Sequence, residues 1–116
     1  MTVVIYHYNR CGTSRSVLAM IEETGVEPVV IDYLETGWTK AQLLGLFAAA
    51  DLTPRAALRA KNSPAEELGL LKDDVPEETI LEAMVAHPIL VNRPIVCTPK
   101  GVRLCRPKEL VTTLLD

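Results

Sequence analysis

The sequence has few aromatic residues and few cysteines: aromatic residues make up 4% of its 116 residues, and cysteine occurs 3 times. No apolar run approaches the roughly 20 residues that a membrane-spanning helix needs. The first residues lack the basic region and the small-residue cleavage site of a secretory signal. The net charge of −3 offers no basic excess for a nucleic-acid or anionic-membrane surface. These absences predict a cytoplasmic protein with no nucleic-acid partner and no membrane partner.

The cysteines also lack paired spacing. Cys11, Cys97 and Cys105 are odd in number and far apart, which predicts neither a disulfide framework nor a zinc site. His7 and His87 add no ligand-like spacing. We therefore expect no metal and no bound cofactor, and the thiols remain available for chemistry.

The length and composition predict one globular domain over residues 1–116, because 48% of the residues are hydrophobic and 23% are charged. Residues 3–6 and 29–31 are apolar runs typical of buried strands. Between them, Thr13 or Ser14 is expected to cap a helix that ends at Gly25. The first part of the chain is thus predicted to form a parallel β-α-β unit.

The next segment, at about 38–88, is predicted to be a helical insertion without strands. Thr39 and Gln42 have the spacing of a capping box. Further helix starts are predicted at Thr53, Ser63 and Pro76. The last of these helices must stop near His87, because Pro88 disfavours helical geometry in the residue before it.

Strand patterns resume after the insertion. Residues 95–98 and 102–105 flank a three-residue turn at 99–101 and predict an antiparallel hairpin. Pro107 is suited to the first turn of a closing helix. The predicted fold is α/β with a mixed four-stranded sheet, in the order β-α-β, helical insertion, β-β-α.

Cys11 lies where the first strand turns into the first helix. The unpaired N–H groups and the positive dipole end of a helix favour a thiolate over a thiol. His7, Arg10 and Arg15 could add to this effect. The alternative is a buried structural cysteine, since free cysteine is among the most buried residue types.

Three arginines are candidates for the same site. Arg93 precedes Pro94, Arg106 precedes Pro107, and Arg59 lies in the insertion. Guanidinium groups match tetrahedral oxyanions and lower the pKa of a neighbouring thiol. A thiolate with several arginines therefore indicates an oxyanion-handling site. A phosphatase loop of the form Cys-x5-Arg is disfavoured, because Arg15 comes too early after Cys11.

The element order, with a cysteine after the first strand and Pro94 opening the third, resembles a thioredoxin-like fold, in which this proline follows a cis peptide bond. The sequence more specifically resembles the glutaredoxin-coupled arsenate reductases over nearly its whole length. The blocks that carry this resemblance are Cys11-Gly12-Thr13-Ser14-Arg15, Tyr33-Leu34-Glu35-Thr36, Leu58-Arg59, Glu66-Glu67-Leu68-Gly69-Leu70, His87-Pro88-Ile89-Leu90, Asn92-Arg93-Pro94-Ile95-Val96 and Leu104-Cys105-Arg106-Pro107.

The resemblance implies that the protein reduces arsenate to arsenite through a covalent cysteine–arsenic intermediate. It implies that Cys11 is the nucleophile and that His7 supports its reactivity. Arg59, Arg93, Arg106 and Ser14 are then the substrate-binding residues.

The reductant also follows from the resemblance. Position 14 is serine, so there is no Cys-x-x-Cys partner, and the family route uses glutathione as co-substrate and then glutaredoxin. One departure from the family pattern concerns the approach to the nucleophile. The usual His-Asn-Pro-x-Cys reads His7-Tyr8-Asn9-Arg10-Cys11 here, which adds bulk and charge next to the thiol.

Other functions remain open from the residues alone. A thiol-based regulator that binds RNA polymerase has a similar fold, but it typically carries a Cys-x-x-Cys sensor. A monothiol oxidoreductase acting on glutathione mixed disulfides would use Cys11 and Pro94 without needing the three arginines together. Cys97 or Cys105 could instead serve as an internal resolving thiol if the hairpin brings one of them to the site or brings the two to face each other.

Overall fold

The computed structural model describes residues 1–116, and it begins with the expected strand–helix–strand unit. Strand β1 (Val4–His7) leads into helix α1 (Gly12–Glu23), and strand β2 (Val29–Asp32) follows. The prediction that Thr13 or Ser14 caps this helix is wrong. The N-cap is Cys11, whose extended backbone (φ −90°, ψ 120°) ends the loop one residue before Gly12.

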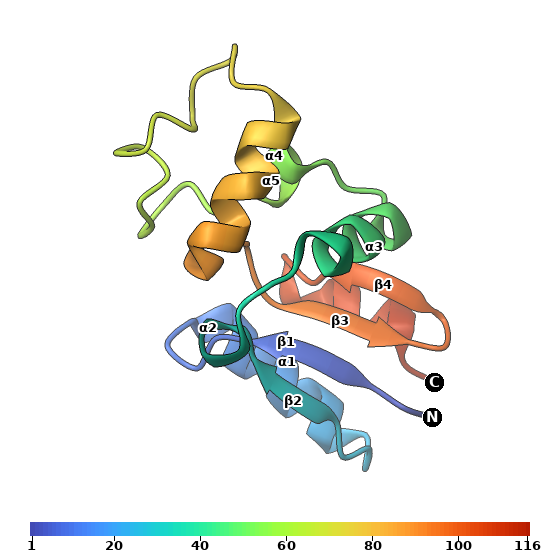
Figure 1. Ribbon diagram of the computed structural model, residues 1–116. Helices are drawn as coiled ribbons and strands as arrows, with labels where there is room; N and C mark the ends of the chain where they lie inside the picture. The colour runs from blue at the N-terminus through green and yellow to red at the C-terminus, as the bar shows by residue number, and fades with distance from the viewer. The chain divides into compact units, whose positions relative to one another are not determined.

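The two remaining strands, β3 (Ile95–Thr98) and β4 (Gly101–Leu104), complete a four-stranded sheet in the order β2-β1-β3-β4 (Figure 1). β1 pairs with β2 in parallel and with β3 antiparallel, and β3 pairs with β4 antiparallel. The predicted mixed α/β fold is confirmed. The hairpin turn is shorter than predicted, because Thr98 pairs directly with Gly101 and leaves two residues between the strands.

A buried apolar cluster joins one face of this sheet to α1 and to the closing helix η2 (Lys108–Leu114). Its members come from β1, α1, β3 and the C-terminal segment: Val3, Ile5, Val17, Ile21, Val96, Cys105, Val111, Leu114 and Leu115. The closing helix was predicted from Pro107 onward, and it is a 3₁₀ helix. Thr112 and Thr113 donate side-chain hydrogen bonds to the carbonyls three residues earlier, which suits the tighter winding.

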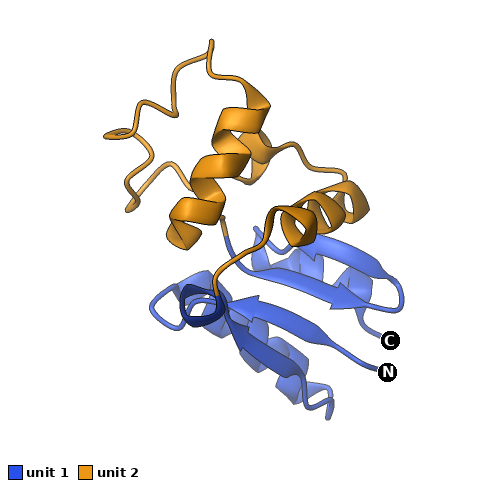
Figure 2. Cartoon of the chain, viewed as in Figure 1, with its two compact units in different colours: residues 1–36, 93–116 blue, residues 37–92 orange.

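The chain divides into two compact units, residues 1–36 with 93–116 and residues 37–92 (Figure 2). The first unit holds the sheet, α1, η2 and the short helix α2 (Tyr33–Thr36). The second holds α3 (Lys40–Ala50), α4 (Pro54–Ala57), α5 (Glu77–Ala86) and η1 (Pro88–Leu90), and it contains no strand, only an isolated bridge between Leu58 and Val91.

Within the second unit, most of the predicted helix boundaries are correct. Thr39 and Gln42 form the capping box at the start of α3, and α5 ends at Ala86, before His87. The helix predicted from Ser63 does not form. The turn that follows Ser63 ends at Gly69, whose N–H donates to the carbonyl of Glu66. The φ of Gly69 is 73°, a left-handed value that cannot continue a right-handed helix.

Candidate active site

The site is built around the thiol of Cys11 at the N-terminus of α1. The carbonyl of Cys11 accepts the first helical hydrogen bond, from Arg15 N–H at 3.0 Å, and its N–H donates to the carbonyl of Tyr8 at 3.0 Å. These two bonds fix the backbone on both sides of the thiol. The residue is half-buried and free of any disulfide.

The surroundings of Cys11 favour its thiolate. Burial alone raises the pKa of the Cys11 thiol, but hydrogen bonds to the sulfur outweigh this effect and hold the pKa below its usual value. They come from the backbone N–H of Ser14, from the side chains of Arg93 and Arg106, and from the backbone N–H of Thr13. Helix amides and two guanidinium groups thus converge on one sulfur, which is the setting of a reactive cysteine.

Arg106 connects the thiol to the loop that carries the other arginine. Its Nη1 donates to Cys11 Sγ at 3.6 Å and to the backbone carbonyl of Arg93 at 3.1 Å. Both arginines precede a cis proline, at Pro94 and Pro107. The cis bond at Pro94 was predicted and is confirmed, whereas the one at Pro107 was not expected.

Arg93 is the more deeply buried arginine, with 3% of its surface exposed. Its guanidinium carbon lies over the Tyr8 ring, 4.6 Å from the ring centroid. It also hydrogen-bonds the Tyr33 hydroxyl. Burial raises the pKa of Tyr33 to about 12, although the Arg93 charge and this hydrogen bond oppose the rise.

No role for Tyr8 or Tyr33 was predicted from the sequence. A signal was present in the predicted parallel pairing of the first two strands. His7 at the end of β1 lies opposite Asp32 at the end of β2, so Tyr8 and Tyr33 follow at the same edge of the sheet. Residues just beyond the carboxyl ends of parallel strands are the usual place for a site.

His7 reaches the site through Ser14 rather than through the sulfur. His7 Nδ1 and Ser14 Oγ are 2.6 Å apart, and both residues are buried. Ser14 Oγ also accepts the N–H of Tyr8 at 3.2 Å, and His7 Nε2 lies 3.4 Å from Asn9 Oδ1. With Nε2 donating to Asn9, Nδ1 accepts the hydroxyl hydrogen of Ser14. The pair therefore holds the turn whose amides face Cys11.

Arg59 belongs to the second unit. The backbone N–H of Arg59 donates to the carbonyl of Leu90 at 2.7 Å, and its Nε donates to the carbonyl of Lys61 at 2.8 Å. These contacts lie within residues 37–92. The role of Arg59 in holding the substrate stays a prediction.

The pKa values of the two other cysteines are shifted in the opposite direction to that of Cys11. Burial raises the pKa of Cys97 and raises that of Cys105 to about 12. Cys105 lies in the apolar cluster together with Val96, so Cys97, the next residue of β3, points to the opposite face of the sheet. In the hairpin Cys97 pairs with Val102, which argues against Cys97 and Cys105 as facing thiols.

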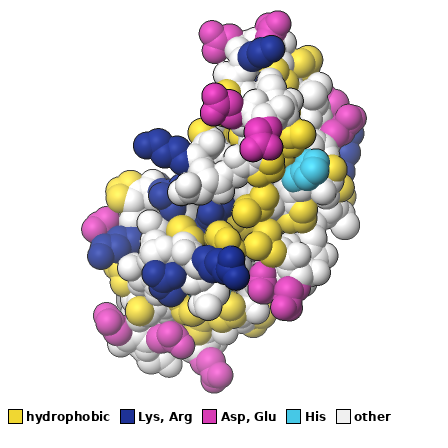
Figure 3. Space-filling view, turned by 90° about the vertical axis from the view of Figure 1, so that its left-hand side faces the viewer, with side chains coloured by type: hydrophobic (Ala, Val, Ile, Leu, Met, Phe, Trp, Pro, Cys, Tyr) yellow, Lys and Arg dark blue, Asp and Glu magenta, His cyan; other side chains and the backbone are white.

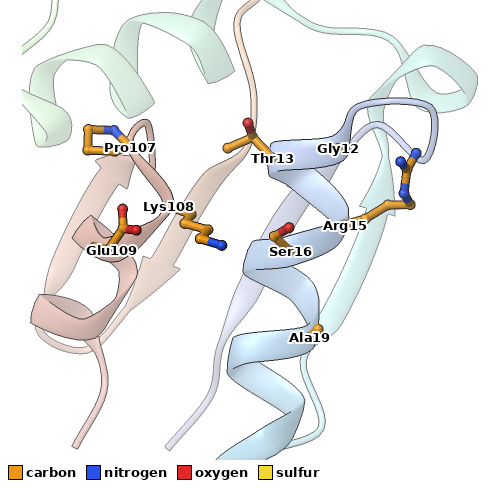
Figure 4. A pocket seen from close by; sticks show the side chains of 8 residues that line it. All are labelled: Gly12, Thr13, Arg15, Ser16, Ala19, Pro107, Lys108 and Glu109. Atoms are coloured by element: carbon orange, nitrogen blue, oxygen red, sulfur yellow. The ribbon is translucent and has the colours of Figure 1, made fainter.

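A groove of about 690 Å³ lies along the first turns of α1, and Gly12, the residue that follows Cys11 in the chain, lines it. Its lining comes from the first turns of α1 and from the start of η2: Gly12, Thr13, Arg15, Ser16, Ala19, Pro107, Lys108 and Glu109 (Figure 4). In Figure 4, Lys108 and Arg15 lie on opposite sides of the α1 turn. Lys and Arg side chains also gather on the molecular face drawn in Figure 3, although the chain carries a net charge of −3.

No helix is both long enough and apolar enough to cross a bilayer. No group of three or more His, Cys, Asp and Glu side chains is arranged to hold a metal ion.

Comparison with known proteins gives consistent results. The chain is 68% identical over 114 residues to arsenate reductase ArsI2 of Synechocystis sp., covering 98% of this chain and 81% of that protein. It is 49% identical over 113 residues to the arsenate reductase of Escherichia coli (strain K12), covering 97% of this chain and 80% of that protein.

Among solved structures, the arsenate reductase from Vibrio cholerae superposes with a TM-score of 0.92 at 39% identity, over 99% of this chain and 98% of that chain. The profile of the ArsC family matches residues 6–114. The matched residues run from β1 to the end of η2 and include Cys11, Arg93 and Arg106. The chain therefore belongs to the ArsC family.

Proposed function

We propose that this protein is an arsenate reductase that reduces arsenate to arsenite through a covalent intermediate on Cys11. The observation that carries the proposal is the half-buried thiol with a lowered pKa, hydrogen-bonded by Arg93 and Arg106. Relatives at 68% and 49% identity that are named arsenate reductases support the same substrate.

In the first step, the Cys11 thiolate attacks arsenic(V). A sulfur–arsenic bond forms, and one arsenate oxygen takes up protons and leaves as water. Arg93 and Arg106 donate to the remaining oxygens and offset their charge during the exchange. Arsenic keeps its oxidation state in this step.

In the second step, an external thiol supplies the electrons. The glutathione thiolate bonds to the Cys11 sulfur, the pair of electrons of the sulfur–arsenic bond stays on arsenic, and arsenite leaves as arsenic(III). Glutaredoxin then attacks the mixed disulfide and releases the Cys11 thiolate. Both thiols belong to the reducing cytoplasm, where we expect the protein to act.

Two features favour an external reductant. Ser14 stands where a Cys-x-x-Cys partner would be, and Cys105 is buried with a raised pKa. The groove between α1 and η2 carries Lys108 and Glu109 on its η2 side. This cation and this anion complement a carboxylate and the ammonium group of glutathione, so we propose this groove as the approach of the second thiol.

We further propose supporting roles for three residues. Arg59 adds a third guanidinium to the bound oxyanion. Ser14 contributes its backbone N–H, and its hydroxyl group, held by His7, keeps that N–H aimed at the sulfur. We expect the whole chain, 1–116, to act as one functional domain with the helical insertion at about 38–88.

The test is arsenite production from arsenate with glutathione and glutaredoxin. We expect wild-type turnover, complete loss in Cys11→Ser, and retained turnover in the matched control Cys97→Ser. Folded wild-type protein that makes no arsenite with either glutaredoxin or thioredoxin would contradict the proposal.

A further inference from the structure

The site contains an aromatic ring that the proposed chemistry does not use. The Tyr8 ring lies under the guanidinium of Arg93, 4.6 Å from its carbon. Arg93 has 3% of its surface exposed, so the cation is largely withdrawn from water. Attraction between a cation and a ring face grows as the cation is desolvated, and it fixes the plane of the guanidinium.

The backbone of Tyr8 belongs to the turn that carries Cys11. Its carbonyl accepts the N–H of Cys11 at 3.0 Å, and its N–H donates to Ser14 Oγ at 3.2 Å. The ring therefore extends from the same turn that carries the nucleophile. A guanidinium resting on this ring is thereby linked to the turn that carries the thiol.

Tyr33 is a second partner of the Arg93 guanidinium. It is 1% exposed and hydrogen-bonds Arg93. It comes from the end of β2, next to the end of β1 from which Tyr8 comes. The Arg93 side chain thus has a ring face on one element and a hydroxyl group on another.

We propose that Tyr8 is a positioning residue that sets the guanidinium plane of Arg93, so that its N–H groups point at the Cys11 sulfur and at the oxyanion bound there. The part of this inference that concerns the oxyanion rests on the proposed function. The part that concerns the thiolate does not, because it requires only Arg93 and Cys11.

The test compares Tyr8→Phe, which keeps a ring face, with Tyr8→Leu and Tyr8→Met, which do not. The first measurement is the pKa of Cys11 from thiolate absorbance as a function of pH, with the Cys11→Ser spectrum subtracted. The second is the KM for arsenate and kcat with glutathione and glutaredoxin. Tyr6→Leu on β1 is the matched control, and unfolding by urea identifies any variant that is not folded.

We expect Tyr8→Leu and Tyr8→Met to raise the Cys11 pKa and to raise the arsenate KM about 3-fold to 30-fold. Tyr8→Phe and Tyr6→Leu should keep both values near those of the wild type. The inference is overturned if folded Tyr8→Leu or Tyr8→Met keeps the wild-type pKa of Cys11. It is also overturned if Tyr8→Phe raises the Cys11 pKa and the arsenate KM as much as Tyr8→Leu does. If the wild type does not reduce arsenate, the proposed function fails, and the pKa comparison still decides the role of Tyr8.

Discussion

At the scale of single residues, one sulfur is distinguished from two others of the same type by its hydrogen bonds. Cys11 receives helix N–H groups and two guanidinium groups, which lower its pKa. Cys97 and Cys105 have raised pKa values because burial is not compensated in the same way. Reactivity should therefore be concentrated on one thiol, although all three are reduced.

Alkylation at neutral pH should modify Cys11 first. Only the thiolate reacts, and a lowered pKa keeps it populated at a lower pH than in an ordinary cysteine. The rate of iodoacetamide addition, followed by mass spectrometry of the individual cysteines, should reach half its maximum at a lower pH for Cys11 than for Cys97 and Cys105. Arg106→Ala should move this midpoint upward, because a donor to Cys11 Sγ is lost. A midpoint that is unchanged in Arg106→Ala would contradict the assigned hydrogen bond.

Ser14→Ala should destabilise the protein by about 1–3 kcal/mol, since it leaves the buried His7 and the Tyr8 N–H without their common partner. Urea unfolding measures this change. Ser16→Ala, on the same helix, is the control and should stay within about 0.5 kcal/mol of the wild type. Equal effects of the two substitutions would show that the Ser14 hydrogen bonds add no stability.

At the scale of elements, the site depends on segments that end at one edge of the sheet. β1 and β2 run in parallel and end at His7 and Asp32, and α1 starts after the loop that follows β1. The start of η2 forms the other wall of the groove that runs along the first turns of α1. The order of the elements was predicted from hydrophobic periodicity. The groove could not be predicted in that way, because it forms only where α1 and η2 contact each other.

Reversing the charge at the groove should weaken the use of glutathione. If glutathione approaches along this groove as proposed, Lys108→Glu should raise its KM about threefold to tenfold, because an exposed cation that would attract a glutathione carboxylate becomes a repelling anion. Lys72→Glu is the matched control in the second unit and should leave this KM unchanged. 2-Mercaptoethanol lacks carboxylates and should react equally with the wild type and with Lys108→Glu. An equal loss with both thiols would place the effect outside glutathione recognition.

At the scale of the whole molecule, the chain forms two compact units, and the candidate residues are divided between them. Cys11, His7, Ser14, Arg93 and Arg106 all lie in the first unit, and Arg59 lies in the second. The pKa of Cys11 is therefore set by groups of its own unit. A contribution of Arg59 should be visible only when the oxyanion is bound.

Arg59→Ala should raise the KM for arsenate about tenfold or more, the usual cost of losing a hydrogen bond to a charged group. The alkylation midpoint of Cys11 should not change, because Arg59 is not among the groups that shift it. Arg103→Ala, an exposed arginine on β4, is the control and should change neither quantity. An unaltered arsenate KM in Arg59→Ala would remove Arg59 from the site.

The sequence by itself determined the elements and the reactive residue. Apolar periodicity, the capping box at Thr39 and the proline positions depend on neighbours within a few residues, so they are readable without a structure. The position of Cys11 between a strand and a helix is local in the same way. Where local signals competed, as at Ser63 before the left-handed Gly69, the sequence pattern was misleading.

Only the tertiary structure decided how distant residues meet. The contact of Arg93 with Tyr8 and the hydrogen bond from Arg106 to Cys11 join segments more than 80 residues apart in the chain. The link between His7 and Ser14 depends on how β1 and α1 are oriented. Such contacts follow from strand pairing and from the packing of α1 and η2 on the sheet, and neither residue type nor spacing encodes the direction in which a side chain points.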